Sequence, residues 1–200
     1  SEIIFVDDGS RDQTRALIDA FLAAHPQRAL RRIFHEKNTG RGGAVSDGFR
    51  AARAPIVGYI DIDLETHARY LPTAYQLIRD GADVAIAHRI YKFQLRSLDR
   101  YVLSHGYHLL AQRTLGIPDL DTESGFKFFR RAALLPLLDE IQDQGWFWDT
   151  EVVVRALRAG LNVVEFPALF LRRFDKTSTV HSVRDSLAYL AHLYRFRRSL

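Results

Sequence analysis

Short apolar runs alternate with amphipathic stretches through the first half of the chain. Residues 3–6 (IIFV) form a continuous apolar run that stops at an acidic, glycine-containing turn, which is typical of a buried strand. Residues 14–24 place their apolar side chains at a helical period. The same patterns predict further strands at 30–35, 56–60 and 83–87, and helices that end near residues 52 and 79. Strands that alternate with helices at this spacing predict an α/β fold, with a mostly parallel sheet and helices on both of its faces.

The second half of the chain is less regular. Helical patterns cover residues 95–115, 150–159 and 182–197, and strand candidates lie at 126–129 and 161–166. The last helix could pack on the core or dock on a membrane surface through its apolar stripe. Because no internal repeat or low-complexity linker divides the sequence, we expect a single domain over residues 1–200.

Composition and charge narrow the classes of function. A hydrophobic fraction of 47% excludes an intrinsically disordered chain, and no run approaches the ~20 apolar residues of a membrane-spanning helix. The absence of cysteine excludes disulfide scaffolds, zinc–thiolate sites and cysteine nucleophiles, and it suits the cytoplasm. The net charge of +4 is a modest excess, so we expect no nucleic-acid partner. A polyanionic small molecule or a membrane surface fits this charge better.

Acidic pairs follow two of the predicted strands. Asp7 and Asp8 come after the first strand, and Asp61 and Asp63 come after the strand at 56–60. Ligands of an open parallel sheet lie beyond the carboxyl ends of its strands. Strand alternation would direct Asp61 and Asp63 to one side, where Mg²⁺ or Mn²⁺ would offset their repulsion and could also hold a diphosphate. Glu65 could add a third ligand, although an acidic turn that caps the next helix explains the same short pattern.

The segment 36–48 (EKNTGRGGAVSDG) is rich in glycine and carries Arg41. Closely spaced glycines let backbone amides approach a phosphate group. The segment is not a dinucleotide-binding fingerprint, because Val45 stands where the third glycine is needed. It is not a P-loop either, because Phe49 stands where the lysine is needed. A phosphate-binding loop and a flexible turn before a helix both remain open.

Five segments occur in the order seen in glycosyltransferase family 2, and they read VDDGSRDQT, NTGRGGAVSDGF, DIDLE, DTESGFKFF and WFWDTEVVVRALRAG. The chain resembles this family from Ile3 to about Ser178, and within it most resembles the polyprenyl- and dolichyl-phosphate sugar synthases. The resemblance implies a GT-A, Rossmann-like nucleotide-diphospho-sugar transferase fold, and it favours the metal-binding interpretation of Asp61 and Asp63. The family normally begins with one earlier strand, so the first strand of the fold is expected to be missing.

The resemblance implies that residues 1–90 bind the nucleotide-sugar donor and the metal. In the family, the aspartates at the positions of Asp7 and Asp8 contact the base and the ribose, and the Asp-x-Asp pair carries the metal bound to the diphosphate. A further loop closes near the nucleotide. Its matching residues here are Asn38, Gly40, Arg41 and Gly42.

The resemblance implies that residues 91–200 form the acceptor half, together with a few residues just before them. The positions that it assigns to the acceptor are Arg89, Arg100, Ser104, Lys127, Arg172 and Lys176. A planar guanidinium suits an acceptor phosphate. The family pattern is not fully matched, because Asp175 stands where a glycine is common in the late basic loop.

The segment WFWDTE leaves alternatives open. Asp149 and Glu151 could stabilise the start of the helix that begins there or could take a direct part in the site. Trp146 and Trp148 could line an acceptor groove or pack in the core.

Together these features predict an inverting, metal-dependent transfer of a sugar from a nucleotide-diphospho-sugar to a polyprenyl phosphate, at the cytoplasmic face of a membrane. A lipid phosphate is already ionised, so the reaction needs no strong general base. If the acceptor is a hydroxyl of a glycan or another molecule, a carboxylate must remove its proton, and Asp121 is the candidate. The missing first strand also leaves open a fragment that binds a nucleotide sugar without turning it over.

Overall fold

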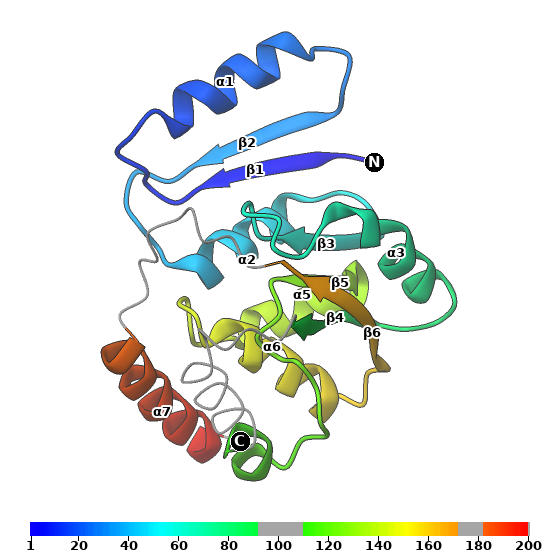
Figure 1. The fold of residues 1–200 in the computed structure, drawn as a ribbon, viewed down its shortest axis with the longest axis vertical. Coiled ribbons are helices and arrows are strands. Elements are labelled where there is room, and N and C mark those ends of the chain that lie inside the picture. The colour runs from blue at the N-terminus through cyan, green and yellow to red at the C-terminus, as the bar shows by residue number, and fades with distance from the viewer. Residues whose placement is uncertain (92–109, 172–181, 200) are drawn as a thin grey trace.

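The computed structural model describes residues 1–91, 110–171 and 182–199 (Figure 1). The strands are β1 (Ile3–Asp7), β2 (Leu30–Phe34), β3 (Ile56–Ile60), β4 (Val84–Tyr91), β5 (Phe126–Arg130) and β6 (Val163–Phe170). The helices are α1 (Thr14–Ala24), α2 (Arg41–Ala51), the 3₁₀ turn η1 (Ala68–Tyr70), α3 (Leu71–Arg79), α5 (Arg131–Glu140), α6 (Trp148–Arg158) and α7 (Ser182–Ser199). Residues 110–115 are also helical. The alternation of strands and helices predicted for the first half is confirmed, and α2 begins at the glycine-rich segment itself.

The described strands form two sheets. Strands β1 and β2 pair in parallel, and a second sheet has the order β3-β5-β4-β6. In the second sheet β4 and β6 are parallel, whereas β5 is antiparallel to both β3 and β4. Three of the four strands therefore point the same way, as expected for a mostly parallel sheet, and β5 alone is reversed. Among the described strands none pairs with both β1 and β3, so the single continuous sheet that the sequence predicted is divided between these two strands.

The core lies on both faces of the four-stranded sheet, and β4 shows why the apolar runs are continuous. Val84 and Ile86 pack with side chains of α2, α5 and α6, whereas Ala85 and Ala87 pack with α3 and β6. Successive side chains of a strand point to opposite faces, so a strand covered on both faces must be apolar at every position. All four side chains are buried. Packing on both faces of the sheet holds the strands in place, and the polar residues described below lie at their ends.

Helix α7 packs on the core through part of its length. Leu193 and Phe196 are buried against Phe147 and Val154, at the lower end of the view in Figure 1. Tyr194, on the same helix, is exposed. The packing of the terminal helix on the core is thus confirmed at Leu193 and Phe196.

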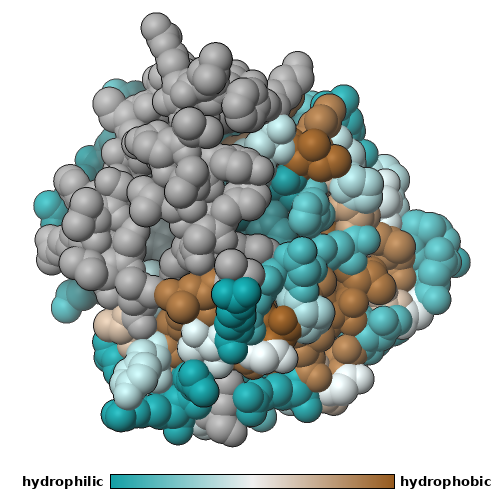
Figure 2. Space-filling model, turned by 60° about the horizontal axis from the view of Figure 1, so that its bottom comes forward, coloured by the Kyte–Doolittle hydropathy of each residue, from teal (hydrophilic) through white to brown (hydrophobic). Residues whose placement is uncertain are grey.

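In Figure 2, apolar side chains are interspersed with polar ones on the face that comes forward. Within residues 1–91, 110–171 and 182–199, no helix combines the length and the low polarity that crossing a bilayer would require.

Candidate active site

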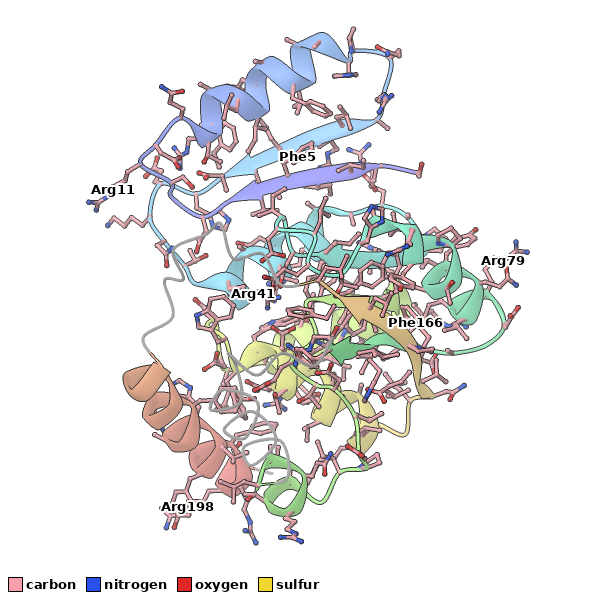
Figure 3. All side chains as sticks on the ribbon, in the orientation of Figure 1. Phe5, Arg11, Arg41, Arg79, Phe166 and Arg198 are labelled. Carbon is pink, nitrogen blue, oxygen red and sulfur yellow. The ribbon has the colours of Figure 1, made fainter. Side chains whose placement is uncertain are left out.

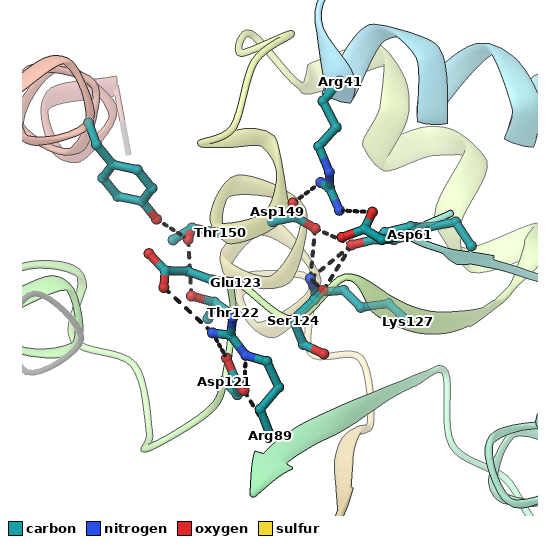
Figure 4. A network of polar contacts seen from close by, with 12 residues as sticks. Arg41, Asp61, Arg89, Asp121, Thr122, Glu123, Ser124, Lys127, Asp149 and Thr150 are labelled. Carbon is teal, nitrogen blue, oxygen red and sulfur yellow. Dashed lines mark hydrogen bonds and ion pairs between the residues drawn. The ribbon is translucent and has the colours of Figure 1, made fainter. Parts of the chain in front are cut away.

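Polar side chains gather at one edge of the four-stranded sheet. Strands β3 and β4 end at this edge, and β5 begins there because it runs in the opposite direction. The first turns of α2 and α6 bring Arg41 and Asp149 to the same place, as the close view in Figure 4 shows. The reversed strand explains why the segment before β5, which is distant in sequence, joins the acidic pair that follows β3.

The acidic pair lies in a turn and not in an extended strand. Strand β3 ends at Ile60, and the backbone N–H of Leu64 donates to the carbonyl of Asp61 at 3.0 Å. Leu64 has a φ of 55°, a left-handed conformation that is costly for a leucine. The strand alternation expected for Asp61 and Asp63 is therefore wrong. The two carboxylates are nevertheless close enough that the charge of Asp63 contributes to raising the pKa of Asp61.

Asp61 lies in a cradle that suits a carboxylate with one side open. Its backbone N–H donates to the carbonyl of Gly125 at 3.0 Å, and a Cβ on Gly125 would lie 1.9 Å from Asp61 Oδ2. The Asp61 side chain is 42% exposed. Burial raises its pKa, and repulsion from Asp149 and Asp63 adds to this, against the opposing effect of Arg41. A bound divalent cation would relieve this repulsion.

The carboxylates after β3 fit a hard cation that also binds a diphosphate. Among the described residues, no three acidic, histidine or cysteine side chains converge as a complete metal site, so Glu65 does not complete one with Asp61 and Asp63. Mg²⁺ in nucleotide-dependent sites is held by one or two carboxylates together with substrate phosphates. Two oxygen-bearing side chains, one of them half exposed, meet that requirement.

Gly125→Ala tests this cradle. The added methyl group must displace the Asp61 carboxylate, because no Cβ fits 1.9 Å from an oxygen atom. We expect the variant to bind Mn²⁺ at least about tenfold more weakly than wild type, as measured by titration calorimetry. Ser124→Ala is the matched control in the same loop, because the Ser124 hydroxyl has no hydrogen-bond partner among the described residues. Unchanged Mn²⁺ affinity in Gly125→Ala would contradict the assignment of the metal to Asp61.

A buried network of charges lies directly behind the acidic pair. Arg41 donates through Nη2 to Asp61 Oδ1 at 2.7 Å and through Nη1 to Asp149 Oδ2 (Figure 4). Lys127, whose side chain is 0% exposed, donates to Asp149 Oδ1 at 2.7 Å and to the Tyr59 hydroxyl at 3.0 Å. Tyr59 in turn donates to Asp149. Asp149 thus joins α2, β3, β5 and α6 through one carboxylate.

Burial and pairing set the protonation of this network. Burial alone would raise the pKa of Asp149, but Lys127 and Arg41 hold it below its ordinary value. Burial lowers the pKa of Lys127, although Asp149 opposes that effect. Burial, followed by the negative charge of Asp149, raises the pKa of Tyr59, so its hydroxyl stays protonated and can donate.

The two aspartates assigned to the donor are already bonded within the protein. Asp7 is buried and accepts from Arg15 Nε at 2.7 Å through Oδ1, whereas its Oδ2 has no partner within the part of the chain that the structure describes. Asp8 accepts from the backbone N–H groups of Thr39 at 2.7 Å and Gly40 at 2.8 Å. Asp8 therefore ties the end of β1 to the start of α2. Contact with a base or a ribose stays a prediction for both aspartates, and Asp7 Oδ2 is the oxygen that accepts no bond from residues 1–91, 110–171 and 182–199.

The glycine-rich segment is shaped by close packing. Gly40 has a φ of 91°, and a Cβ on it would lie 2.3 Å from the Gln144 carbonyl. A Cβ on Gly42 would lie 2.4 Å from Trp148 Cβ. Asn38 donates through Nδ2 to the carbonyl of Asp8 and accepts from the backbone N–H of Gly40. These contacts place the start of α2 against α6, and they account for the glycines without a phosphate.

The two tryptophans have different roles. Trp148 is fully buried, its Nε1 donates to Ser46 Oγ at 2.9 Å, and its ring stacks on Phe49. Trp146 is 58% exposed, and its ring centroid lies 5.3 Å from the guanidinium carbon of Arg41. Trp148 is therefore a core residue, and Trp146 covers one side of Arg41.

Arg89 and Asp121 form one bidentate pair at the end of β4. Arg89 donates to Asp121 through Nε at 2.8 Å and through Nη2 at 2.7 Å, and its backbone N–H donates to the same carboxylate. The Asp121 backbone N–H donates to Glu165. Both oxygens of Asp121 are thus engaged, and a general-base role would require it to release Arg89. Burial alone would raise the pKa of Asp121, but Arg89 holds it below its ordinary value.

The pair predicts a pH dependence of stability. Because the folded-state pKa of Asp121 lies below its ordinary value of 3.8, the unfolded chain takes up its proton more readily. The ion pair therefore stabilises the fold at pH values above 3.8, and its contribution to the unfolding free energy is lost as the pH falls through the lower folded-state pKa. We expect the difference in unfolding free energy between wild type and Asp121→Asn, measured by urea titration, to shrink below about pH 4. A difference that stayed constant from pH 7 to pH 3 would contradict this.

Several predicted acceptor residues lie outside the described part of the chain. They are Arg100, Ser104, Arg172 and Lys176. Of the remaining two, Arg89 is held by Asp121, and Lys127 is buried beneath the site with its ammonium bonded to Asp149. Their contact with an acceptor stays a prediction.

Two residues of the network, Tyr59 and Asp149, are not indicated by the sequence as partners of Arg41 and Lys127. Tyr59 was not singled out, because it lies inside an apolar strand candidate. Asp149 was noticed only as a helix-start residue with an open alternative. One signal was available: Lys127 stands among the apolar residues of FKFF, and a lysine in a buried strand requires a carboxylate partner. Glu151, two residues after Asp149, instead accepts hydrogen bonds from the backbone N–H groups of residues 142 and 143 and so holds that loop.

Comparison with known proteins identifies the fold and the family of the chain. The fold is that of nucleotide-sugar transferases of the GT-A type. Glucosyl-3-phosphoglycerate synthase of Mycobacterium tuberculosis, in complex with Mn²⁺, UDP-glucose and phosphoglyceric acid, superposes with a TM-score of 0.70 at 20% identity, covering 97% of this chain and 68% of that one. Residues 1–137 match the model of Glycosyl transferase family 2, and the chain belongs to this family. The family resemblance drawn from the five sequence segments is confirmed.

Two curated relatives show which members of the family the chain is similar to. The chain is 37% identical over 197 residues to the glycosyltransferase AglD of Haloferax volcanii, covering 97% of this chain and 31% of AglD. It is 30% identical over 189 residues to the dolichyl-phosphate beta-glucosyltransferase of Saccharomyces cerevisiae, covering 83% of this chain and 55% of that protein. The chain thus spans about a third of the length of AglD and just over half of the length of the yeast protein.

Proposed function

We propose that this protein transfers a sugar from a nucleotide-diphospho-sugar to the phosphate of a polyprenyl lipid of the dolichyl type, with inversion at the sugar carbon and with the help of Mg²⁺ or Mn²⁺. In this proposal residues 1–90 bind the donor and residues 91–200 bind the acceptor at the cytoplasmic face of a membrane. The observation that carries it is the placement of Asp61 at the sheet edge, where it is bonded to Arg41 and lies close enough to Asp63 to feel its charge. The names of the dolichyl-phosphate relatives support the acceptor.

Charge is the main problem that the site must solve. When the bond between the sugar carbon and the diphosphate breaks, negative charge grows on the leaving group. A divalent cation bound to Asp61 and Asp63 would supply Lewis-acid stabilisation of that charge. Arg41, close behind the pair, adds a second positive charge that keeps its proton at all relevant pH values.

The state of Asp121 favours a phosphate acceptor over a hydroxyl acceptor. A hydroxyl must lose its proton during attack, and the carboxylate proposed for that task has both oxygens bonded to Arg89. A phosphate monoester is already an anion, so it needs orientation and no base. Asp121 then serves to orient Arg89 at the end of β4.

A transfer assay separates the candidate functions. Radiolabelled UDP- and GDP-sugars are incubated with Mn²⁺ and a polyprenyl phosphate, and the product is partitioned between water and an organic solvent. Label in the organic phase supports the lipid acceptor, and a β-linked product from an α-linked donor supports inversion. Label transferred only to a soluble glycan would favour a hydroxyl acceptor. Mn²⁺-dependent nucleotide binding without any turnover would favour a binding protein.

A further inference from the structure

Arg41 already occupies the position of a countercharge to Asp61. Its Nη2 lies 2.7 Å from Asp61 Oδ1, and the carboxylate of Asp61 is the group to which the proposed function assigns the divalent cation. A cation that takes the lone pair of this oxygen to which Arg41 donates breaks the bond to Arg41, and a cation elsewhere on the carboxylate repels the guanidinium at close range. Two positive groups therefore compete for one carboxylate.

Arg41 is also held from its other side. Its Nη1 donates to Asp149, whose carboxylate is fixed by Lys127 and Tyr59. The Arg41 side chain is only 15% exposed, and the aromatic rings of Tyr59 and Trp146 each lie with their centroids 5.3 Å from its guanidinium carbon. Loss of the bond to Asp61 would leave the guanidinium attached to Asp149 and enclosed by these rings.

We propose that Arg41 neutralises Asp61 until a divalent cation displaces it, and that Asp149 then keeps the guanidinium beside the site, with Nη2 turned to the diphosphate. This inference rests on the proposed function, since it takes Asp61 as the metal ligand. It makes Asp149 a positioning residue, which acts through Arg41 and touches neither the metal nor the donor. A planar guanidinium suits the role, because it can bond a carboxylate and a phosphate oxygen with different nitrogens.

The first test measures Mn²⁺ binding without nucleotide, by the loss of the free-ion signal in electron paramagnetic resonance. Arg41→Gln removes the competing cation, so we expect its affinity for Mn²⁺ to rise by about fivefold over wild type. The gain should vanish when Asp61→Asn is added. Arg79→Gln is the charge-matched control, because Arg79 lies on α3 at the far side of the molecule in Figure 3, and we expect its affinity to equal that of wild type.

The second test uses pyrophosphate with saturating Mn²⁺ as a probe for the diphosphate, which avoids any choice of nucleotide base. We expect Arg41→Gln to weaken pyrophosphate binding by about tenfold in calorimetry. Asp149→Asn should weaken it by a similar factor and should add nothing in the Arg41→Gln background. Because Asp149→Asn leaves the Lys127 ammonium without its carboxylate, the paired variant Asp149→Asn with Lys127→Met is measured beside it, and thermal melts confirm folding.

Each result decides a different part of the inference. If Asp61→Asn abolishes Mn²⁺ binding but Arg41→Gln does not strengthen it beyond the Arg79→Gln control, the competition is refuted and the proposed metal site stands. If Mn²⁺ binding is unchanged in Asp61→Asn, both the inference and the metal site of the proposed function are wrong. If the effects of Arg41→Gln and the Asp149 variants on pyrophosphate binding add, Asp149 does not act through Arg41.

Discussion

Replacement of Asp61 by asparagine is expected to lower the initial rate of sugar transfer by at least about a hundredfold. The substitution keeps the size of the side chain and removes the charge that would hold the divalent cation. It also leaves Arg41 with Asp149 as its remaining carboxylate partner. The measurement is the initial rate in the radiolabelled donor assay over a range of Mn²⁺ concentrations, and Asp63→Asn is expected to act in the same direction.

Asp139→Asn serves as the control for this loss of activity. Asp139 lies on α5 with an exposed side chain, and its only partner in the described structure is the half-exposed Arg50. Its activity should equal that of wild type. Full transfer activity and an unchanged Mn²⁺ dependence in both Asp61→Asn and Asp63→Asn would refute the metal site.

Replacement of Asp149 by asparagine is expected to destabilise the fold by about 3 kcal/mol, because it leaves the Lys127 ammonium buried without an anion. For a chain of this size, the melting temperature should fall by about 6–12 °C. Removal of both charges in the Asp149→Asn, Lys127→Met variant should recover most of that loss, since no buried charge is then left unpaired. Thermal unfolding followed by circular dichroism measures both.

The same exposed aspartate on α5 supplies the comparison for stability. Asp139→Asn breaks a surface ion pair, for which a change within about 1 kcal/mol is expected. If Asp149→Asn were no more destabilising than Asp139→Asn, the buried network would be unimportant for the fold.

The sequence predicted most of the helices and strands because their buried positions recur at short intervals along the chain. β4 is apolar at four successive positions since it is covered on both faces, and α3 shows its helical period since one face meets the sheet. The reversal of β5 was not predictable from pattern, because an apolar strand has no direction until its partners are known. The division between β1 and β3 likewise depends on long-range pairing.

The sequence predicted the charged site residues that directly follow a strand, and it missed the role of those that are buried. Asp61 stands out because it ends an apolar run. Asp149 does not stand out, because an acidic residue in the first turn of a helix already has a local explanation. Asp149 and Arg41 are more than a hundred residues apart in the sequence, and the ion pairs of Asp149 with Arg41 and Lys127 join three separate elements. Only the folded chain therefore reveals them.

The bidentate pair of Arg89 and Asp121 has a consequence for exchange between homologous proteins. Arg89 lies near the end of β4 and Asp121 shortly before β5, so this ion pair closes the excursion of the chain between the two strands at its base. A chimaera that replaces the intervening segment with that of a relative should therefore keep both paired residues, so that the ion pair still joins β4 to the segment before β5.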